Sequence, residues 1–122
     1  VDGNRTGDIG YAVQSYAESF GFSVVRELEG HGIGKGMHEE PGVPNYGRRG
    51  HGTRLVSGMT ICIEPMINAG TKAVYLAKNG WAVHTQDHRN AAHYELTVVI
   101  RKGKAELLST FDFIENDSNI KF

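Results

Sequence analysis

Two histidines in a glycine-rich segment are the first residues of this chain whose types and spacing could do chemistry. His31 and His38 lie seven residues apart in the run Gly-His-Gly-Ile-Gly-Lys-Gly-Met-His-Glu-Glu-Pro, which spans residues 30–41. Neutral imidazole binds Zn, Co, Fe and Mn, and it can also hydrogen-bond a substrate carbonyl. Glycine permits unusual backbone angles and close approach of other groups. The segment therefore favours a loop that brings side chains to a site, although a surface turn with two solvated histidines is the competing interpretation.

Two glutamates add oxygen donors to this imidazole. Glu64 lies within the apolar run 59–66, and Glu95 lies within the β-rich run 92–100. A buried carboxylate is costly unless it is paired, protonated or bound to a cation. A salt bridge or an exposed edge-strand position would also explain Glu64. Two such glutamates together with His31 nevertheless make a donor set suited to a divalent metal.

Strand alternation brings two further side chains into consideration. In an extended strand, Cys62 lies on the same face as Glu64, and His93 on the same face as Glu95. Cys62 is thus a candidate neighbour of the site, although a small buried hydrophobe is the simpler interpretation. The remaining histidines are expected to be solvated; they are His51, His84 and His88.

The elements that must position these residues follow from periodicity and turn signals. Apolar residues at helical spacing predict an amphipathic helix over about 8–20, with Gly21 as its stop. The expected strands are 22–28, 59–66 with Pro65 as its stop, a hairpin of 73–77 with 81–85, and a second hairpin of 92–100 with 105–108. Residues 39–58 predict a long ordered loop, and the tail from residue 115 a loose one. The fold class is α+β, an antiparallel sheet with a flanking helix.

Length and composition limit the classes of function. The chain has 122 residues, a net charge of −1 and 22% charged residues, so no nucleic-acid or membrane partner is expected. The single cysteine cannot form an internal disulfide, and no secretory leader is visible, which together favour the cytoplasm. The first residue is Val1, which suggests a fragment or a processed chain.

With His31, His38, Glu64 and Glu95 assembled, the chain resembles the C-terminal half of the type I methionine aminopeptidases. The run 30–41, followed by Val-Pro-Asn-Tyr at 43–46, is similar to the histidine signature of that family. The further matching motifs follow in the same order; they are Ile-Glu-Pro-Met at 63–66, Asn-Gly-Trp at 79–81 and Tyr-Glu-Leu-Thr at 94–97. Prolidase-type relatives share the histidine and glutamate pattern, but Met37, Trp81 and the Asn45-Tyr46 pair favour the methionine enzymes.

The resemblance implies half of a pita-bread fold: residues 1–122 would be one domain, the C-terminal catalytic half, with the N-terminal half absent. Two divalent metal ions (Co, Mn, Fe or Zn) would lie in the intact enzyme, ligated by His31, Glu64 and Glu95. Glu64 would also be the general base toward the attacking water. His38 would hydrogen-bond the scissile carbonyl. Met37 and Trp81 would line the pocket for the methionine side chain of a nascent peptide.

The sequence departs from the family pattern in ways that leave alternatives open. The aspartate pair and the further catalytic histidine of the family belong to the absent half, so the chain is expected to be inactive alone. The other departures are tolerable; they are Leu28, Cys62, His93 and Leu96. An X-Pro aminopeptidase or prolidase-like enzyme of the same fold, or a non-catalytic binding remnant, remain the alternative functions. Without the other half, the inner face of the sheet should be exposed and the chain should associate.

Overall fold

A single helix, α1, precedes all the strands. The computed structural model describes residues 1–80 and 82–111, and α1 spans Thr6–Ser19. It begins two residues earlier than predicted because the Asp8 carboxylate accepts a hydrogen bond from the Arg5 backbone N–H at 2.7 Å, which satisfies a free donor of the first turn. Gly21 ends it as predicted, with φ of +79°, an angle that glycine adopts without steric cost.

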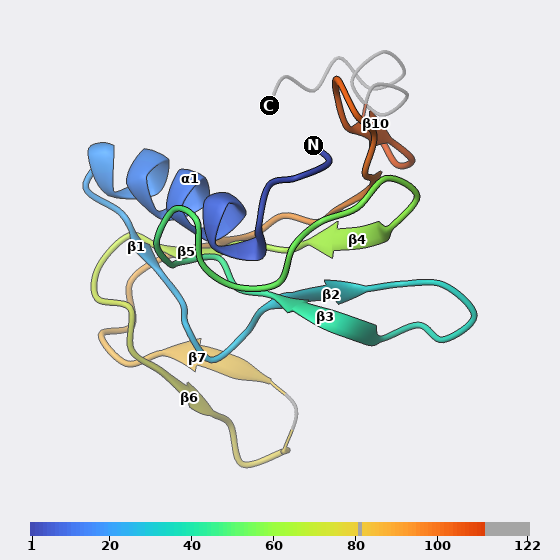
Figure 1. Cartoon of the computed structure of the whole chain (residues 1–122). Coiled ribbons are helices and arrows are strands. Elements are labelled where there is room, and N and C mark those ends of the chain that lie inside the picture. The colour runs from blue at the N-terminus through green and yellow to red at the C-terminus, as the bar shows by residue number, and fades with distance from the viewer. Residues whose placement is uncertain (81, 112–122) are drawn as a thin grey trace.

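The strands within the described residues are short and entirely antiparallel in their pairing. Five of them form one sheet in the order β10-β9-β4-β2-β3, with bounds Glu106–Leu107, Leu96–Val99, Thr60–Ile63, Gly30–Gly32 and Glu39–Val43. Three form a second sheet in the order β1-β5-β8, with bounds Ser23–Val24, Met66–Asn68 and Ala91–His93. The strands β6 and β7, Val74–Leu76 and Val83–Thr85, make the hairpin predicted around Asn79-Gly80. Figure 1 shows α1 along one side of the sheets and this hairpin projecting on the other.

Both glutamates lie at breaks between strands; Pro65 indicated the first break, and the sequence pattern did not reveal the second. The predicted strand 59–66 divides into β4 and β5 at Glu64-Pro65, since Pro65 has no N–H to continue a ladder. The predicted strand 92–100 divides into β8 and β9 at Tyr94-Glu95. The two breaks face each other, because the Tyr94 N–H donates to the Pro65 carbonyl oxygen at 3.1 Å. Glu64 and Glu95 thus share the corner where the chain passes from one sheet to the other.

Two other predicted elements need correction. The loop predicted over 39–58 begins with β3, which pairs with β2. Pro41 did not prevent this pairing because β3 is an edge strand of its sheet, and an edge strand tolerates a residue that cannot donate. The strand predicted over 22–28 is limited to Ser23–Val24.

The hydrophobic core lies between the five-stranded sheet and its connections. Its buried members are Val43, Leu55, Ile61, Val98 and Ile100, and Ile9 of α1 packs against them. The same helix contacts β1 and β3. No helix among the described residues has the length and apolar character needed to span a bilayer. The tail predicted from residue 115 lies outside the described residues.

Candidate metal centre

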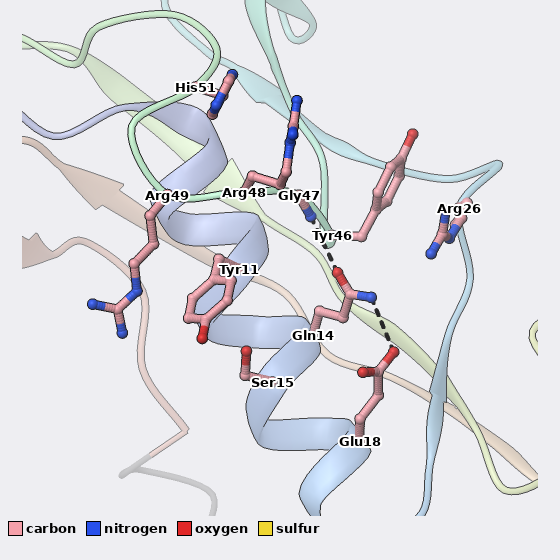
Figure 2. Close-up of a pocket in the computed structure, with 10 residues that line it drawn as sticks. All are labelled: Tyr11, Gln14, Ser15, Glu18, Arg26, Tyr46, Gly47, Arg48, Arg49 and His51. Atoms are coloured by element: carbon pink, nitrogen blue, oxygen red, sulfur yellow. Dashed lines mark hydrogen bonds between the residues drawn. The ribbon is translucent and has the colours of Figure 1, made fainter.

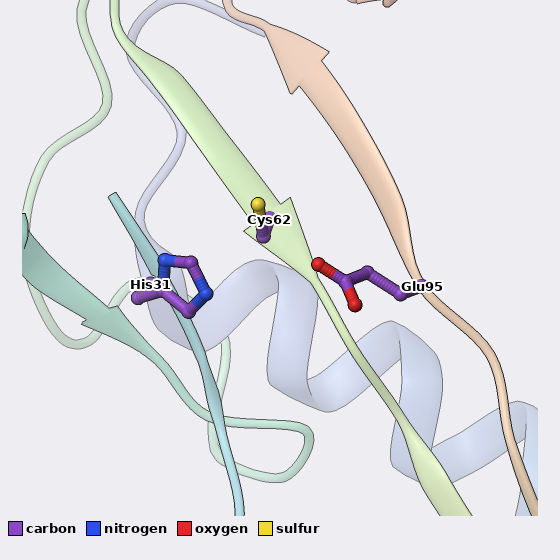
Figure 3. A group of neighbouring side chains, drawn as sticks. All are labelled: His31, Cys62 and Glu95. Atoms are coloured by element: carbon purple, nitrogen blue, oxygen red, sulfur yellow. The ribbon is translucent and has the colours of Figure 1, made fainter. Parts of the chain in front are cut away.

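Three adjacent strands position the predicted ligands. His31 on β2 pairs with Cys62 on β4, and Cys62 in turn pairs with Thr97 on β9. Glu64 directly follows β4, and Glu95 directly precedes β9. The antiparallel register therefore brings the end of β4 and the start of β9 together. Figure 3 shows the His31 ring and the Glu95 carboxylate directed toward each other across Cys62.

A glycine makes the close approach of β2 and β4 possible. A Cβ atom added at Gly30 would collide with the Cys62 backbone carbonyl oxygen, which a strand cannot easily move. Gly30 is thus required by contact with a neighbouring strand, and it keeps the adjacent His31 beside the two glutamates.

The donor atoms of the predicted ligands lie within coordinating reach of one another. The Nε2 atom of His31 is 2.8 Å from Oε2 of Glu64. Glu95 belongs to two groups whose donor atoms all lie within 4.8 Å of one another: His31, Cys62 and Glu95 in one, and Glu64, His93 and Glu95 in the other. Glu95 therefore joins the two groups, as a carboxylate that contacts two cations would.

The contacts of His31 and Glu64 fit a cation between them. Nδ1 of His31 lies 2.9 Å from the Gly32 carbonyl oxygen, which can only accept, so Nδ1 carries a proton and the neutral ring presents the lone pair of Nε2. Nε2 lies 2.8 Å from Oε2 of Glu64 and forms an ion pair with it when the ring is protonated; within the described chain that buried oxygen has no other partner. The residues present therefore fit a divalent metal.

The predicted site residues His38 and Met37 lie outside the two donor groups. The ring of His38 lies 4.1 Å from that of His31 between centroids, tilted by 50°, and both line a depression of about 440 Å³. Met37 does not line this depression, and 73% of its surface is exposed. Trp81 lies outside the described residues.

Two neighbours of the predicted ligands, Cys62 and His93, lie closer to the site than the strand pattern alone could establish. Cys62 is fully buried as its simpler interpretation required, yet it also belongs to a donor group with His31. Burial raises the pKa of the Cys62 thiol, opposed by its contact with Thr97 and reinforced by the nearby glutamates. His93 Nε2 lies 3.7 Å from Oε1 of Glu64, and strand alternation relative to Glu95 was the signal for it. The acidic lining of the depression was not foreseen; it comprises Glu29, Glu39 and Glu40.

Comparison with known proteins defines the class to which this site belongs. Residues 1–102 match the metallopeptidase family M24, and the chain belongs to that family. Family membership implies divalent metal cofactors, in agreement with the cluster of donors.

Particular relatives are methionine aminopeptidases. That of Clostridium acetobutylicum is 55% identical over 109 residues, which make up 89% of this chain and 44% of the relative. The solved structure of methionine aminopeptidase from Rickettsia prowazekii is 48% identical with a TM-score of 0.84, covering 87% of this chain and 43% of that one. The structure from Thermotoga maritima is 43% identical with a TM-score of 0.85, covering 88% and 43%. The resemblance and the fold class are thus confirmed: the chain has part of a pita-bread fold and spans less than half the length of these relatives.

Proposed function

We propose that this chain is the C-terminal half of a methionine aminopeptidase, with residues 1–122 as one domain. The activity is metal-dependent removal of the initiator methionine from nascent proteins. The observation that supports this most is the corner shared by Glu64 and Glu95, where a buried carboxylate oxygen of Glu64 lies 2.8 Å from Nε2 of His31. The proposal agrees with the activity for which the relatives are named, and it places the enzyme in the cytoplasm.

The residues that would hold the metal ions are His31, Glu64 and Glu95, the last of which belongs to both donor groups. The donor chemistry is compatible with Co, Mn, Fe or Zn. Bound divalent ions supply Lewis acidity toward a carbonyl and lower the pKa of water. Three protein ligands leave the pair of ions incompletely held, so the chain alone should bind them weakly and remain inactive. The missing N-terminal half of the fold is the partner that would complete the site.

Glu64 and His38 carry the proposed proton chemistry. Glu64 accepts the proton of the attacking water, because its carboxylate reaches the corner and its buried Oε2 has no partner other than His31 in the described chain. His38 donates a hydrogen bond to the scissile carbonyl oxygen from the adjacent depression. Met37 and Trp81 are proposed to contact the substrate methionine side chain. The exposure of Met37 indicates that this pocket needs further protein to enclose it.

The test is to join the chain behind the N-terminal half of the Clostridium acetobutylicum relative and to assay peptide hydrolysis with added Mn²⁺ or Co²⁺. The joined protein should release methionine from Met-Gly-Met and from Met-Ala peptides, and the chain alone should not. Glu64→Gln in the joined protein should abolish turnover without loss of fold. Robust turnover by the chain alone would refute the proposal that it carries an incomplete metal site.

The same assay separates the alternatives. Hydrolysis of X-Pro peptides in place of Met-Ala peptides would indicate the prolidase-like enzyme. Absence of any turnover in a folded, metal-loaded joined protein would indicate the non-catalytic binding remnant. Near-normal turnover by the Glu64→Gln variant would remove Glu64 from the mechanism.

A further inference from the structure

A second concave surface lies between α1 and the loop that follows β3. This groove has a volume of about 730 Å³ and shares no lining residue with the depression that holds His31 and His38. Figure 2 shows side chains of the helix and of the loop along it. Its cationic and aromatic lining comprises Tyr11, Arg26, Tyr46, Arg48, Arg49 and His51.

The groove is locally basic although the chain as a whole is nearly neutral. Three arginines line it against one carboxylate, that of Glu18. Residues 41–63 contain no aspartate or glutamate at all. Another carboxylate, that of Asp8, contacts the loop at Gly50, and its pKa is lowered by hydrogen bonds from the Gly50 and Arg5 backbones and also by the charge of Arg49. Among residues 1–80 and 82–111, none of the three lining guanidinium groups forms an ion pair.

Two of the arginines are stacked on tyrosines. The guanidinium carbon of Arg26 lies 4.7 Å from the Tyr46 ring centroid, and that of Arg49 lies 4.6 Å from the Tyr11 ring centroid. Stacking uses the face of the guanidinium plane and leaves its N–H groups directed outward from the edge. Those N–H groups remain available to bind the oxygens of a phosphate in a bidentate manner.

The loop that carries these side chains is fixed to the helix. The Gly47 N–H donates to Oε1 of Gln14 at 3.2 Å, and the Gly50 N–H donates to Oδ1 of Asp8 at 2.8 Å. A Cβ atom at Gly10 of α1 would collide with the Tyr46 carbonyl oxygen, so the loop backbone lies directly on the helix. The lining is therefore held in place before a ligand arrives, which lowers the entropic cost of binding.

We propose that this groove binds the phosphodiester backbone of single-stranded nucleic acid. The arginines come from two segments of the chain and are spread along the groove in Figure 2, which suits a chain of phosphates better than one isolated anion. Proteins that bind single strands without sequence preference do so in a positively charged groove that follows the phosphate backbone. The net charge of −1 predicted no nucleic-acid partner. The groove differs from that prediction because the segment 41–63 carries arginines and no carboxylate, which the net charge of the whole chain does not reveal.

The experiment measures the fluorescence anisotropy of a labelled oligouridylate about 12 nucleotides long, titrated with the whole chain at about 50 mM salt. The double variant Arg48→Glu/Arg49→Glu should bind about tenfold more weakly or worse, and the salt slope should fall by about 1 for each phosphate that the variant no longer binds. The matched control is Lys102→Glu/Lys104→Glu. It changes the net charge equally at the exposed turn between β9 and β10, outside the groove, and should bind like the wild type.

Each result decides the proposal. Selective weakening in the arginine variant supports it, and circular dichroism establishes that this variant folds; if it does not, Arg26→Glu against Lys102→Glu makes the same comparison. Uridine monophosphate that competes at equal phosphate concentration would overturn the proposal of a strand and identify a single nucleotide as the sufficient ligand. No binding by the wild type, equal weakening in both double variants, or equally effective competition by polyglutamate would also overturn it.

Discussion

Two stretches of chain, 60–68 and 91–99, contribute strands to both sheets, yet the sides on which these sheets lie differ in how fully their apolar residues are buried. On the five-stranded side, Ile61 and Val98 are buried in the core. On the three-stranded side, Tyr16 and Phe20 of α1 are 71% and 61% exposed, beside an apolar cavity of about 450 Å³ that also contacts Ile67 of β5. The first side is therefore stabilised by contacts within this chain, whereas the second presents an apolar surface that further protein would bury.

The largest change should be in the free energy of unfolding, which a substitution on the five-stranded side should lower more than one on the three-stranded side. Ile61→Ala removes a fully buried side chain from the core, so the free energy of unfolding should fall by about 2–5 kcal/mol. Phe20→Ala should change it by about 0.5 kcal/mol or less, since its ring is mostly in solvent. Urea denaturation followed by circular dichroism measures both. Similar decreases in the two variants would mean that the three-stranded side is as well packed as the other.

The next effect concerns association of the chain. The exposed side should make the protein self-associate with rising concentration, and Tyr16→Ser with Phe20→Ser should shift it toward the monomer. Sedimentation velocity over a range of concentrations gives the distribution. A wild-type chain that stays monomeric throughout would contradict the exposure of this side.

A smaller effect is expected at His38. His38→Ala in the joined protein should lower the rate of hydrolysis while the metal content stays near that of the parent, because its proposed contact is with substrate. His31→Ala should instead lower the metal content. Metal analysis after desalting distinguishes them, with His84→Ala on the hairpin as the control. A large loss of metal in His38→Ala would make His38 a ligand.

The smallest effect is a pH dependence at the start of α1. The Gly50 and Arg5 backbone N–H groups lower the pKa of Asp8, so its carboxylate stabilises the folded state above the unfolded pKa of about 3.9. That contribution is lost as the pH falls through the folded pKa. Asp8→Asn should therefore lower the melting temperature at neutral pH, and the difference from the wild type should vanish at the acid end. A difference that stays the same from neutral pH to the acid end would contradict the assignment.

The sequence predicted the elements whose signals are local. The helix and its end at Gly21 followed from spacing, and the hairpin followed from Asn79-Gly80. Glu64 and Glu95 were recognisable because charges are rare inside apolar runs. Pro65 signalled the end of the first strand, but the break at Glu95 was not recognisable, since strand alternation continues through Glu95 and the pairing of two sheets reveals the corner.

Other features depend on contacts that are distant in sequence. The pairing of β3 with β2 overrode the low strand propensity of Pro41, because an edge position tolerates it. The apolar stripe of α1 correctly predicted a helix, but its spacing could not tell which members would be covered. Ile9 packs against the core, whereas Phe20 does not. The basic groove also arises from folding, since Arg26 joins Arg48 and Arg49 only when the loop lies on α1.

The central claim is that His31, Glu64 and Glu95 share a bound cation, and calorimetric titration of the metal-free chain with Mn²⁺ or Co²⁺ tests it most directly. Glu95→Gln should weaken binding at least about tenfold. Glu106→Gln, the same change at an exposed position on β10, should leave binding unaltered. Equal affinities for the wild type and the Glu95→Gln variant would contradict the account.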